Sequence, residues 1–416
     1  MAERASKPDK RSAAETLALI QSVLRDIHPR DFAVELWDGS CWEPEKTQFR
    51  RFTWKINNPE ALRRVFDSPN RQLALGEAYV REAFDIIGDI EAVFPLADYL
   101  IGKEWGTFEK LRIVGMFREF QAFKWERETG SRVRFSGVSH SKERDQEAIR
   151  YHYDVSNDFY ELWLDHNMLY SCAYFKDPLQ DLDTAQIQKM DRICKQLCLK
   201  QGERLIDIGC GWGGLIIHAA RTYGVHATGI TISEAQVDLT QKRICAAGIS
   251  ARCEVRRLDY RDLKKLGACD KLVSIGMVEH VGEFHLQEYF QHAFRELRPG
   301  GTFLNSGIAR PANRPSSKQL TFTDVYVFPD GELPTIATLV STAKAAGFEV
   351  RALENLRDHY YYTTRRWLQR LEAKAEEARR IIGEKRYRIW RLYLAGSAYY
   401  FRKGWLDLYQ TLLSKA

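Results

Sequence analysis

The chain has 416 residues, 44% of them hydrophobic, and a formal net charge of +6 at pH 7. It is long enough to bury a sizeable core, yet no apolar run approaches the roughly 18 residues of a membrane-spanning helix, which excludes that class of protein. The first residues lack the apolar block of a secretory signal, and the eight cysteines follow neither a disulfide framework nor the spacing of a zinc site. We therefore expect a cytoplasmic chain with reduced thiols and no bound metal.

The first part of the chain predicts a small domain over residues 16–125. Apolar residues alternate in DFAVELWDGSCWEP and FRRFTWKIN, residues 31–44 and 49–57, which is typical of a short β element. Asn58 then caps a helix that has proline at its first position, and we expect helices to fill residues 59–125.

Two segments around this domain show no regular pattern. Residues 1–15 are polar and are predicted to form a disordered tail. Residues 126–147 are also polar and rich in turn formers, so we interpret them as a linker. Residues 148–416 are then left as a second domain.

From residue 148 onward, helical segments alternate with β-branched ones. The apolar spacing of residues 183–199 predicts a helix capped by Asp183. Predicted strands lie at 204–209, 226–233, 253–259, 270–277, 300–308, 348–356 and 406–413, with the last at an edge of the sheet. This alternation predicts an α/β fold with a parallel sheet covered on both faces.

A glycine-rich turn follows the first of these strands in LIDIGCGWGG, residues 205–214. Gly209 and Gly211 let the backbone approach a ligand that a Cβ would exclude, and Asp207 is placed to accept a hydrogen bond. Gly213 comes one position earlier than the third glycine of a dinucleotide fingerprint. The spacing therefore predicts a class I S-adenosylmethionine methyltransferase with a Rossmann-like, seven-stranded sheet. The alternative is a structural turn with incidental glycines.

Two further strand ends offer polar groups to the same cofactor. GITISEAQ lacks the acidic residue that usually binds a ribose, so Thr231 and Gln236 would supply the polar contacts. LDYRDL places Asp259 and Tyr260, a polar and a flat side chain, where an adenine would lie. The cofactor residues predicted around these three strand ends are Asp207, Gly209, Cys210, Gly211, Trp212, Gly213, Thr231, Ile232, Gln236, Asp259 and Tyr260.

The C-terminal region is basic and aromatic. From Arg365 onward there are thirteen Lys or Arg against five Asp or Glu, interleaved with Trp and Tyr. Such a surface could meet an anionic membrane or a nucleic acid. The alternative, a solvated helical face over a buried aromatic stripe, is the better explanation from composition alone.

Five segments in a fixed order carry a resemblance to a known family. They are YHYDVSNDFYELWLDHNMLYSCAYF, LIDIGCGWGG, GITISEAQ, SIGMVEHVG and HYYYTTRRW. Through them, residues 148–416 resemble the cyclopropane-fatty-acyl-phospholipid synthases and the related mycolic acid cyclopropane synthases. NPEALRRVF and LALGEAYVREAFDIIGDI resemble, more weakly, the lipid-binding N-terminal domain of the bacterial enzymes.

The resemblance implies a reaction in which a methylene group passes from S-adenosylmethionine to the cis double bond of an acyl chain in a phospholipid, forming a cyclopropane ring. An alkene is a poor nucleophile, so the site must exclude water and stabilise a carbocation, which aromatic faces do. By resemblance, Tyr170 and Ser171 contact the cofactor. Cys172 would offer its backbone amide to a bound bicarbonate ion, which removes the proton before the ring closes.

The same resemblance assigns Glu279 and Tyr360 as hydrogen-bond partners of the bicarbonate. The alternative for Glu279 is an acid that caps a helix after the fourth strand, and Tyr361 and Tyr362 leave the tyrosine ambiguous by one position. We interpret His280 as a core histidine.

Two positions depart from the family pattern. In LNSGIA, Ile308 is retained, but Ser306 stands where the family usually has a histidine, and Ser397 replaces a common cysteine. A serine is shorter than a histidine and carries no charge, so the base could be held less firmly. The product is then either a cyclopropane or a methyl-branched or methylene-bearing chain.

Three functional hypotheses remain from the sequence. The first is lipid C-methylation, with unsaturated phospholipid acyl chains at the inner face of the membrane as partners, no nucleic acid, and a possible homodimer. The second is N-methylation of a small amine, since some alkaloid N-methyltransferases share this catalytic domain. The third is a catalytically inactive lipid-binding protein, motivated by Ser306.

Overall fold

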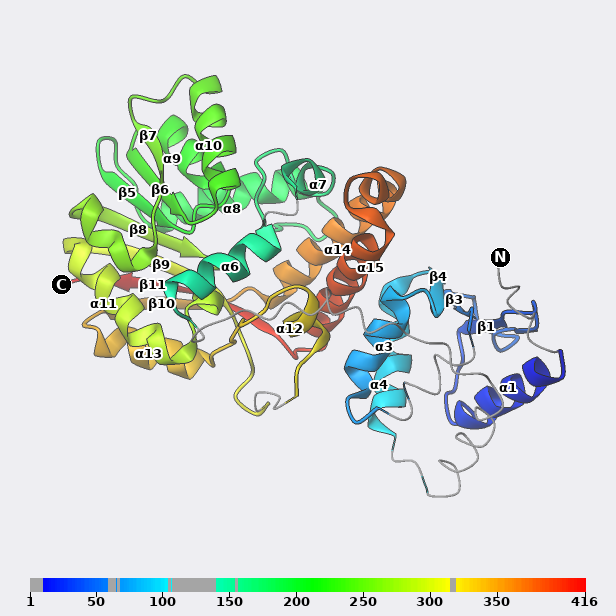
Figure 1. Ribbon diagram of the computed structural model, residues 1–416. Helices are drawn as coiled ribbons and strands as arrows, with labels where there is room; N and C mark the ends of the chain where they lie inside the picture. Colours follow the sequence, from blue (N-terminus) through cyan, green and yellow to red (C-terminus); the bar gives the residue numbers. More distant parts are fainter. Residues whose placement is uncertain are drawn as a thin grey trace. The chain divides into compact units, whose positions relative to one another are not determined.

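The computed structural model describes residues 10–58, 65, 68–103, 106, 140–153, 156–314 and 319–416 (Figure 1). The chain divides into two compact units. The first comprises Met1–Arg132, Gln319–Phe322 and Arg388–Leu392, and the second comprises Val133–Lys318, Thr323–Tyr387 and Tyr393–Ala416. No helix in the described part of the chain combines the length and apolarity that crossing a membrane requires.

The first unit is built on a four-stranded sheet. Its strands are β1 (Phe32–Leu36), β2 (Cys41–Trp42), β3 (Phe52–Ile56) and β4 (Phe84–Gly88), in the order β2-β1-β3-β4. The helices among the described residues of this unit include α1 (Lys10–Val23), α3 (Arg71–Val80), the 3₁₀ turn η1 (Ile90–Val93) and α4 (Phe94–Gly102). The predicted β element is confirmed, because both apolar segments form strands whose side chains are mostly buried.

Three predictions for this part of the chain need correction or stay untested. The expectation of helices throughout 59–125 was wrong at β4, which pairs antiparallel with β3 and completes the sheet. The predicted tail was too long, because α1 begins at Lys10. The predicted helix start at 59–64 and most of the predicted linker lie outside the described residues, and helix α6 (Lys142–Tyr153) begins inside that linker.

The second unit is an α/β sandwich around a seven-stranded sheet, as the sequence predicted. The strands are β5 (Arg204–Ile208), β6 (His226–Thr231), β7 (Cys253–Arg257), β8 (Cys269–Ile275), β9 (Leu297–Ala309), β10 (Glu349–Asn355) and β11 (Asp407–Ser414), in the order β10-β11-β9-β8-β5-β6-β7. Strands β5 to β9 pair in parallel, and β11 pairs antiparallel with both its neighbours. The prediction that the last strand lies at the edge of the sheet was therefore wrong, because β10 lies outside β11.

Helices cover both faces of this sheet. One apolar core joins α8 (Leu182–Gln196), α9 (Gly214–Tyr223) and α10 (Glu234–Ala246) to the sheet, and the other joins α11 (Leu286–Glu296) and α13 (Ile336–Ala345) to its opposite face (Figure 1). The split follows the strand period of two, since Leu205 belongs to the first core and Ile206 to the second. The remaining α-helices are α7 (Asn157–Glu161), α12 (Phe322–Tyr326), α14 (Arg357–Ala373) and α15 (Ala375–Arg402).

Helix α8 starts earlier than its sequence suggested. Asp181, not Asp183, is the capping residue, and its side chain accepts a hydrogen bond from the amide of Thr184. Asp183 lies inside the first turn, where it accepts hydrogen bonds from His166 and Arg370 instead.

Candidate active site

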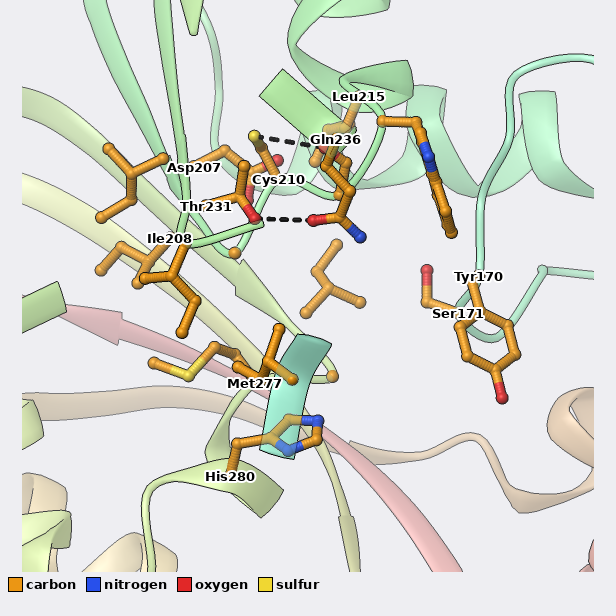
Figure 2. A pocket seen from close by; sticks show the side chains of 18 of the residues that line it. Tyr170, Ser171, Asp207, Ile208, Cys210, Leu215, Thr231, Gln236, Met277 and His280 are labelled. Atoms are coloured by element: carbon orange, nitrogen blue, oxygen red, sulfur yellow. Dashed lines mark hydrogen bonds between the residues drawn. The ribbon is translucent and has the colours of Figure 1, made fainter. Parts of the chain in front are cut away.

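A cavity opens at the carboxyl ends of β5, β6 and β8, where a doubly wound sheet usually binds its ligand. Asp207, Thr231 and Met277 line it from the strand ends, and Tyr170 and Ser171 face them from the opposite side (Figure 2). Of the residues predicted to bind the cofactor, all except Gly213 line this cavity. They include Gly209, Cys210, Gly211, Trp212 and Ile232.

The glycine turn shapes the cavity through its backbone. Gly209 and Gly211 have φ of +84° and +54°, a region that L-residues with side chains rarely adopt. A Cβ on Gly211 would have no heavy atom within 4 Å, so this glycine faces open space, whereas one on Gly213 would lie 2.4 Å from Thr240 Cγ2. Gly211 therefore makes room for a ligand, and Gly213 makes room for helix α10.

The ends of β5 and β6 place polar groups on the floor of the cavity. The Thr231 hydroxyl donates to Gln236 Oε1 at 2.6 Å, which fixes the amide that was predicted to contact the ligand in place of an acid (Figure 2). Asp207 is buried, and burial raises the pKa of its carboxyl to about 7. A cationic group of a ligand would restore the charge of this acid.

An ion-pair cluster closes the cavity beyond β7. Arg261 donates to Asp259 Oδ2 at 2.9 Å and to Asp145 Oδ2 at 2.6 Å, so it joins two acids that line the cavity. Its guanidinium lies 4.6 Å from the centre of the Tyr260 ring. Asp145 belongs to α6 and fell inside the predicted linker, which is why the sequence analysis missed it.

Lys189 of α8 is a second cavity residue that the sequence analysis missed. Its Nζ donates to Ser171 Oγ at 2.6 Å and to Gln186 Oε1 at 3.1 Å. Gln186 Nε2 in turn donates to the carbonyl oxygens of Leu169 at 3.2 Å and Ser171 at 2.9 Å. A signal was present, because Lys189 interrupts the apolar stripe of this helix, four residues before buried Ile193.

Glu279 lies at the other end of the site, in the turn η3 (Val278–His280) after β8. Its Oε1 accepts a hydrogen bond from the Ile308 amide at 2.6 Å, and its Oε2 is buried with no partner among the described residues. Burial raises the pKa of this carboxyl to about 7. His280 lines the cavity, and burial lowers its pKa to about 4, so it is a neutral group on the cavity wall.

Three other predicted catalytic residues share one apolar cluster. Cys172, Ile308 and Tyr360 pack together with Leu356 and Leu408. Burial raises the pKa of the Cys172 thiol to about 12, so it stays protonated. No hydrogen bond in the described part of the chain uses the Cys172 amide, whereas the next amide, of Ala173, donates to Thr363 Oγ1 at 2.9 Å.

The three consecutive tyrosines have different surroundings, which distinguishes Tyr360 from its neighbours. The Tyr361 hydroxyl accepts from Arg365 at 3.1 Å, and Tyr362 packs against Phe175, so Tyr360 alone of the three belongs to the Cys172 cluster. Ser306 is buried on β9, beside Ile275 of β8, which lines the cavity.

Aromatic rings connect the cavity to the Cys172 cluster. Tyr170 packs against Trp367 with ring centres 5.1 Å apart, and Tyr360 lies 6.0 Å from the same tryptophan. The Tyr170 hydroxyl lies 3.4 Å from that of Tyr393. Negative ring faces of this kind stabilise a cation without supplying a nucleophile. No group of three or more potential metal ligands occurs among the described residues.

Comparisons with known proteins agree with this geometry. The family model described as mycolic acid cyclopropane synthetase matches residues 140–411, and a model of a domain of unknown function matches residues 19–98. A probable fatty acid methyltransferase of Pseudomonas putida is 39% identical over 405 residues, 96% of this chain and 95% of the relative. The cyclopropane-fatty-acyl-phospholipid synthase of Escherichia coli is 34% identical over 275 residues, 66% of this chain and 69% of that protein.

A solved structure shows the same catalytic fold. The mycolic acid cyclopropane synthase crystallised with SAH and CTAB superposes with a TM-score of 0.62 at 31% identity, covering 65% of this chain and 98% of that one. The SAH in that structure is the product form of the cofactor that the glycine turn predicted.

Proposed function

Because the chain belongs to the mycolic acid cyclopropane synthetase family of S-adenosylmethionine-dependent methyltransferases that act on lipids, we propose that it adds one carbon to the cis double bond of an acyl chain in a membrane phospholipid. The preferred product is a cyclopropane ring. When bound, S-adenosylmethionine supplies the electrophilic carbon and bicarbonate supplies the base.

The residues of this chain divide the work between two ends of the site. The glycine turn, Thr231 and Gln236 hold the nucleoside, as their position around the cavity supports. The rings of Tyr170, Trp367 and Tyr360 exclude water and stabilise positive charge on the acyl chain.

The observation that carries the proposal is a pair of polar atoms without hydrogen-bond partners in the described part of the chain, close to the aromatic residues named above. Glu279 Oε2 and the Cys172 amide are both without a partner among the described residues. Ile308 links them, because its amide donates to Glu279 and its side chain packs against Cys172. An acceptor and a donor held this way match bicarbonate, which has one hydroxyl and two anionic oxygens.

Methyl transfer to phospholipid vesicles tests the proposal. Vesicles with cis-unsaturated acyl chains are incubated with enzyme and cofactor labelled in its methyl group, and the acyl chains are analysed by mass spectrometry. The proposal requires label in a ring-containing chain whose mass rises by one CH2 unit. Label that never enters the acyl fraction, with intact cofactor binding, contradicts it.

A methyl-branched or methylene-bearing product is the second candidate, and Ser306 favours it. The buried serine gives the bicarbonate at most one short, neutral hydrogen bond, so the base is placed less firmly against the methyl proton whose loss closes the ring. The cation can then lose a neighbouring proton to the same base instead, which leaves a methyl-branched or methylene-bearing chain that keeps a double bond. In Ser306→His, we expect the fraction of cyclopropane to rise, measured as the ratio of ring to branched product. An unchanged ratio would show that this position does not select the product.

A further inference from the structure

The charges around the cofactor cavity do not cancel within the protein. The acidic side chains that line it are Asp145, Asp207 and Asp259, and the one Lys or Arg among its described lining residues is Lys189. Arg261 joins Asp145 and Asp259 in a single cluster, so these two acids have a cation already. Lys189 and Asp207 are left as one positive and one negative group without an ion pair in the described part of the chain.

Both of these groups are buried, and the attraction of neighbouring opposite charges offsets only part of the cost of that burial. Lys189 has 5% of its surface exposed and Asp207 has 4%. Burial lowers the pKa of the lysine to about 8 and raises that of the aspartic acid to about 7, so each charge is weakly held in the absence of ligand. A lysine that only fills space is unfavourable at a buried position, because burying a charge costs free energy unless the charge is paired. Its position beside a ligand cavity therefore points to a binding role.

No neighbouring carboxylate forms an ion pair with the Lys189 ammonium group in the described part of the chain. The other carboxylate that acts on it, Asp165, accepts hydrogen bonds from the amides of Asn167 at 2.9 Å and Leu169 at 2.8 Å. The partners of Lys189 are two neutral oxygens, on Ser171 and Gln186. An ammonium group has three donors, so one remains for a ligand.

S-adenosylmethionine ends in an α-amino acid, which carries a carboxylate and an ammonium group. We propose that Lys189 binds the carboxylate of the cofactor, with Ser171 holding the ammonium group of the lysine in position. Asp207 then faces the ammonium group of the cofactor across the cavity. The inference concerns the cofactor alone and stands whichever lipid product the enzyme forms.

Decarboxylated S-adenosylmethionine is the probe that isolates this contact, because it keeps the sulfonium and the ammonium groups and lacks only the carboxylate. Binding of each ligand is measured by titration calorimetry without lipid, on the wild type and on Lys189→Met, whose side chain has a similar length and no charge. S-adenosylhomocysteine serves as a third ligand, since it keeps the carboxylate and lacks the sulfonium charge.

The expected result is a loss of preference rather than a general loss of binding. We expect the wild type to bind S-adenosylmethionine at least about 30-fold more tightly than its decarboxylated form, as for a buried charge pair. In Lys189→Met, affinity for S-adenosylmethionine and S-adenosylhomocysteine falls by at least about 30-fold, and affinity for the decarboxylated ligand changes by less than about 3-fold.

Gln186→Leu is the control for the loop, because it releases Leu169 and Ser171 and keeps the lysine side chain, with Ser171 Oγ as its remaining acceptor. It should weaken all three ligands by a similar factor. If Lys189→Met also weakens all three alike, the lysine only positions the loop and the inference is overturned. Wild-type protein that binds the two forms of S-adenosylmethionine equally overturns it without any variant, so the test does not depend on whether Lys189→Met folds.

Discussion

The two ends of the site are built in different ways. At the cofactor end, the consecutive residues from Gly209 to Trp212 and the ends of neighbouring strands surround the cavity, and most polar side chains there have partners. At the reaction end, Cys172, Glu279, Ile308 and Tyr360 come from four distant segments. There Glu279 Oε2 and the Cys172 amide have no hydrogen-bond partner among the described residues.

The two ends therefore depend on different kinds of interaction. A nucleoside is bound by backbone shape, which a single side chain can block but which few side chains support. A reaction that passes through a cation needs groups held ready in a dry site, and unpaired buried groups are the mark of that arrangement. Substitutions at the first end should therefore change affinity, and those at the second should change turnover.

The largest effect is expected at the glycine turn. Gly211→Val should weaken binding of S-adenosylhomocysteine by at least about 100-fold, because valine is strained at φ +54° and its side chain enters the cavity. Titration calorimetry measures this loss. Gly248→Val is the control, since Gly248 has φ +67° and open space around it but does not line the cavity. Loss of binding in both variants would mean that strain, and not occupied space, is responsible.

Glu279→Gln should separate turnover from affinity. We expect kcat to fall by about 100-fold or more, because the amide cannot accept the bicarbonate hydroxyl with the strength of a carboxylate. The affinity for S-adenosylhomocysteine should change by less than about 3-fold, since Glu279 does not line the cofactor cavity. Steady-state rates on phospholipid vesicles and calorimetry check the two halves. Equal losses of both quantities would erase the distinction between the two ends.

The same carboxyl should make the folded state sensitive to pH. Its pKa rises from 4.5 to about 7 on folding, so the unfolded chain ionises first and the stability of the fold decreases as pH rises between these values. Removing the carboxyl in Glu279→Gln should reduce the loss of unfolding free energy between pH 5 and 8 by about 2 kcal/mol. Urea unfolding at both pH values measures the difference. The exposed Glu283, changed to Gln, should leave the loss as it is in the wild type.

The residues predicted for the cofactor end lie around one cavity, and they could be grouped from the sequence because their signals are local. The spacing of Gly209 and Gly211 after a strand requires only backbone chemistry to interpret, and both line the cavity. Lys189 and Asp145 were not predicted as cavity residues. Their charges are visible in the sequence, but which way each helix faces is known only once it is packed against the sheet. The edge position of β11 was wrong for a similar reason, since the order of strands depends on long-range pairing.

The reaction end could not be assembled from local patterns. Residues 172, 279, 308 and 360 lie on a loop, a 3₁₀ turn, a strand and a helix, and no periodicity links them. Their assignment came from resemblance, and the structure brings the first and third together with Tyr360 in one cluster. Their roles in the reaction stay predictions.

The smallest effect is expected at Cys172, whose side chain attracts attention because it is a thiol. Its pKa of about 12 leaves it protonated and poorly nucleophilic, so Cys172→Ala should lower kcat by less than about 3-fold. In the proposed function the backbone amide of Cys172 is the part in use, and Thr363 holds this segment by accepting from the adjoining Ala173 amide. Thr363→Val, which keeps the shape and removes that acceptor, should therefore lower kcat more than Cys172→Ala does, by about 10-fold. If Cys172→Ala lowers kcat more than Thr363→Val does in vesicle assays, the reaction end uses covalent or acid-base chemistry of a side chain. The two ends of the site would then not differ in the way proposed.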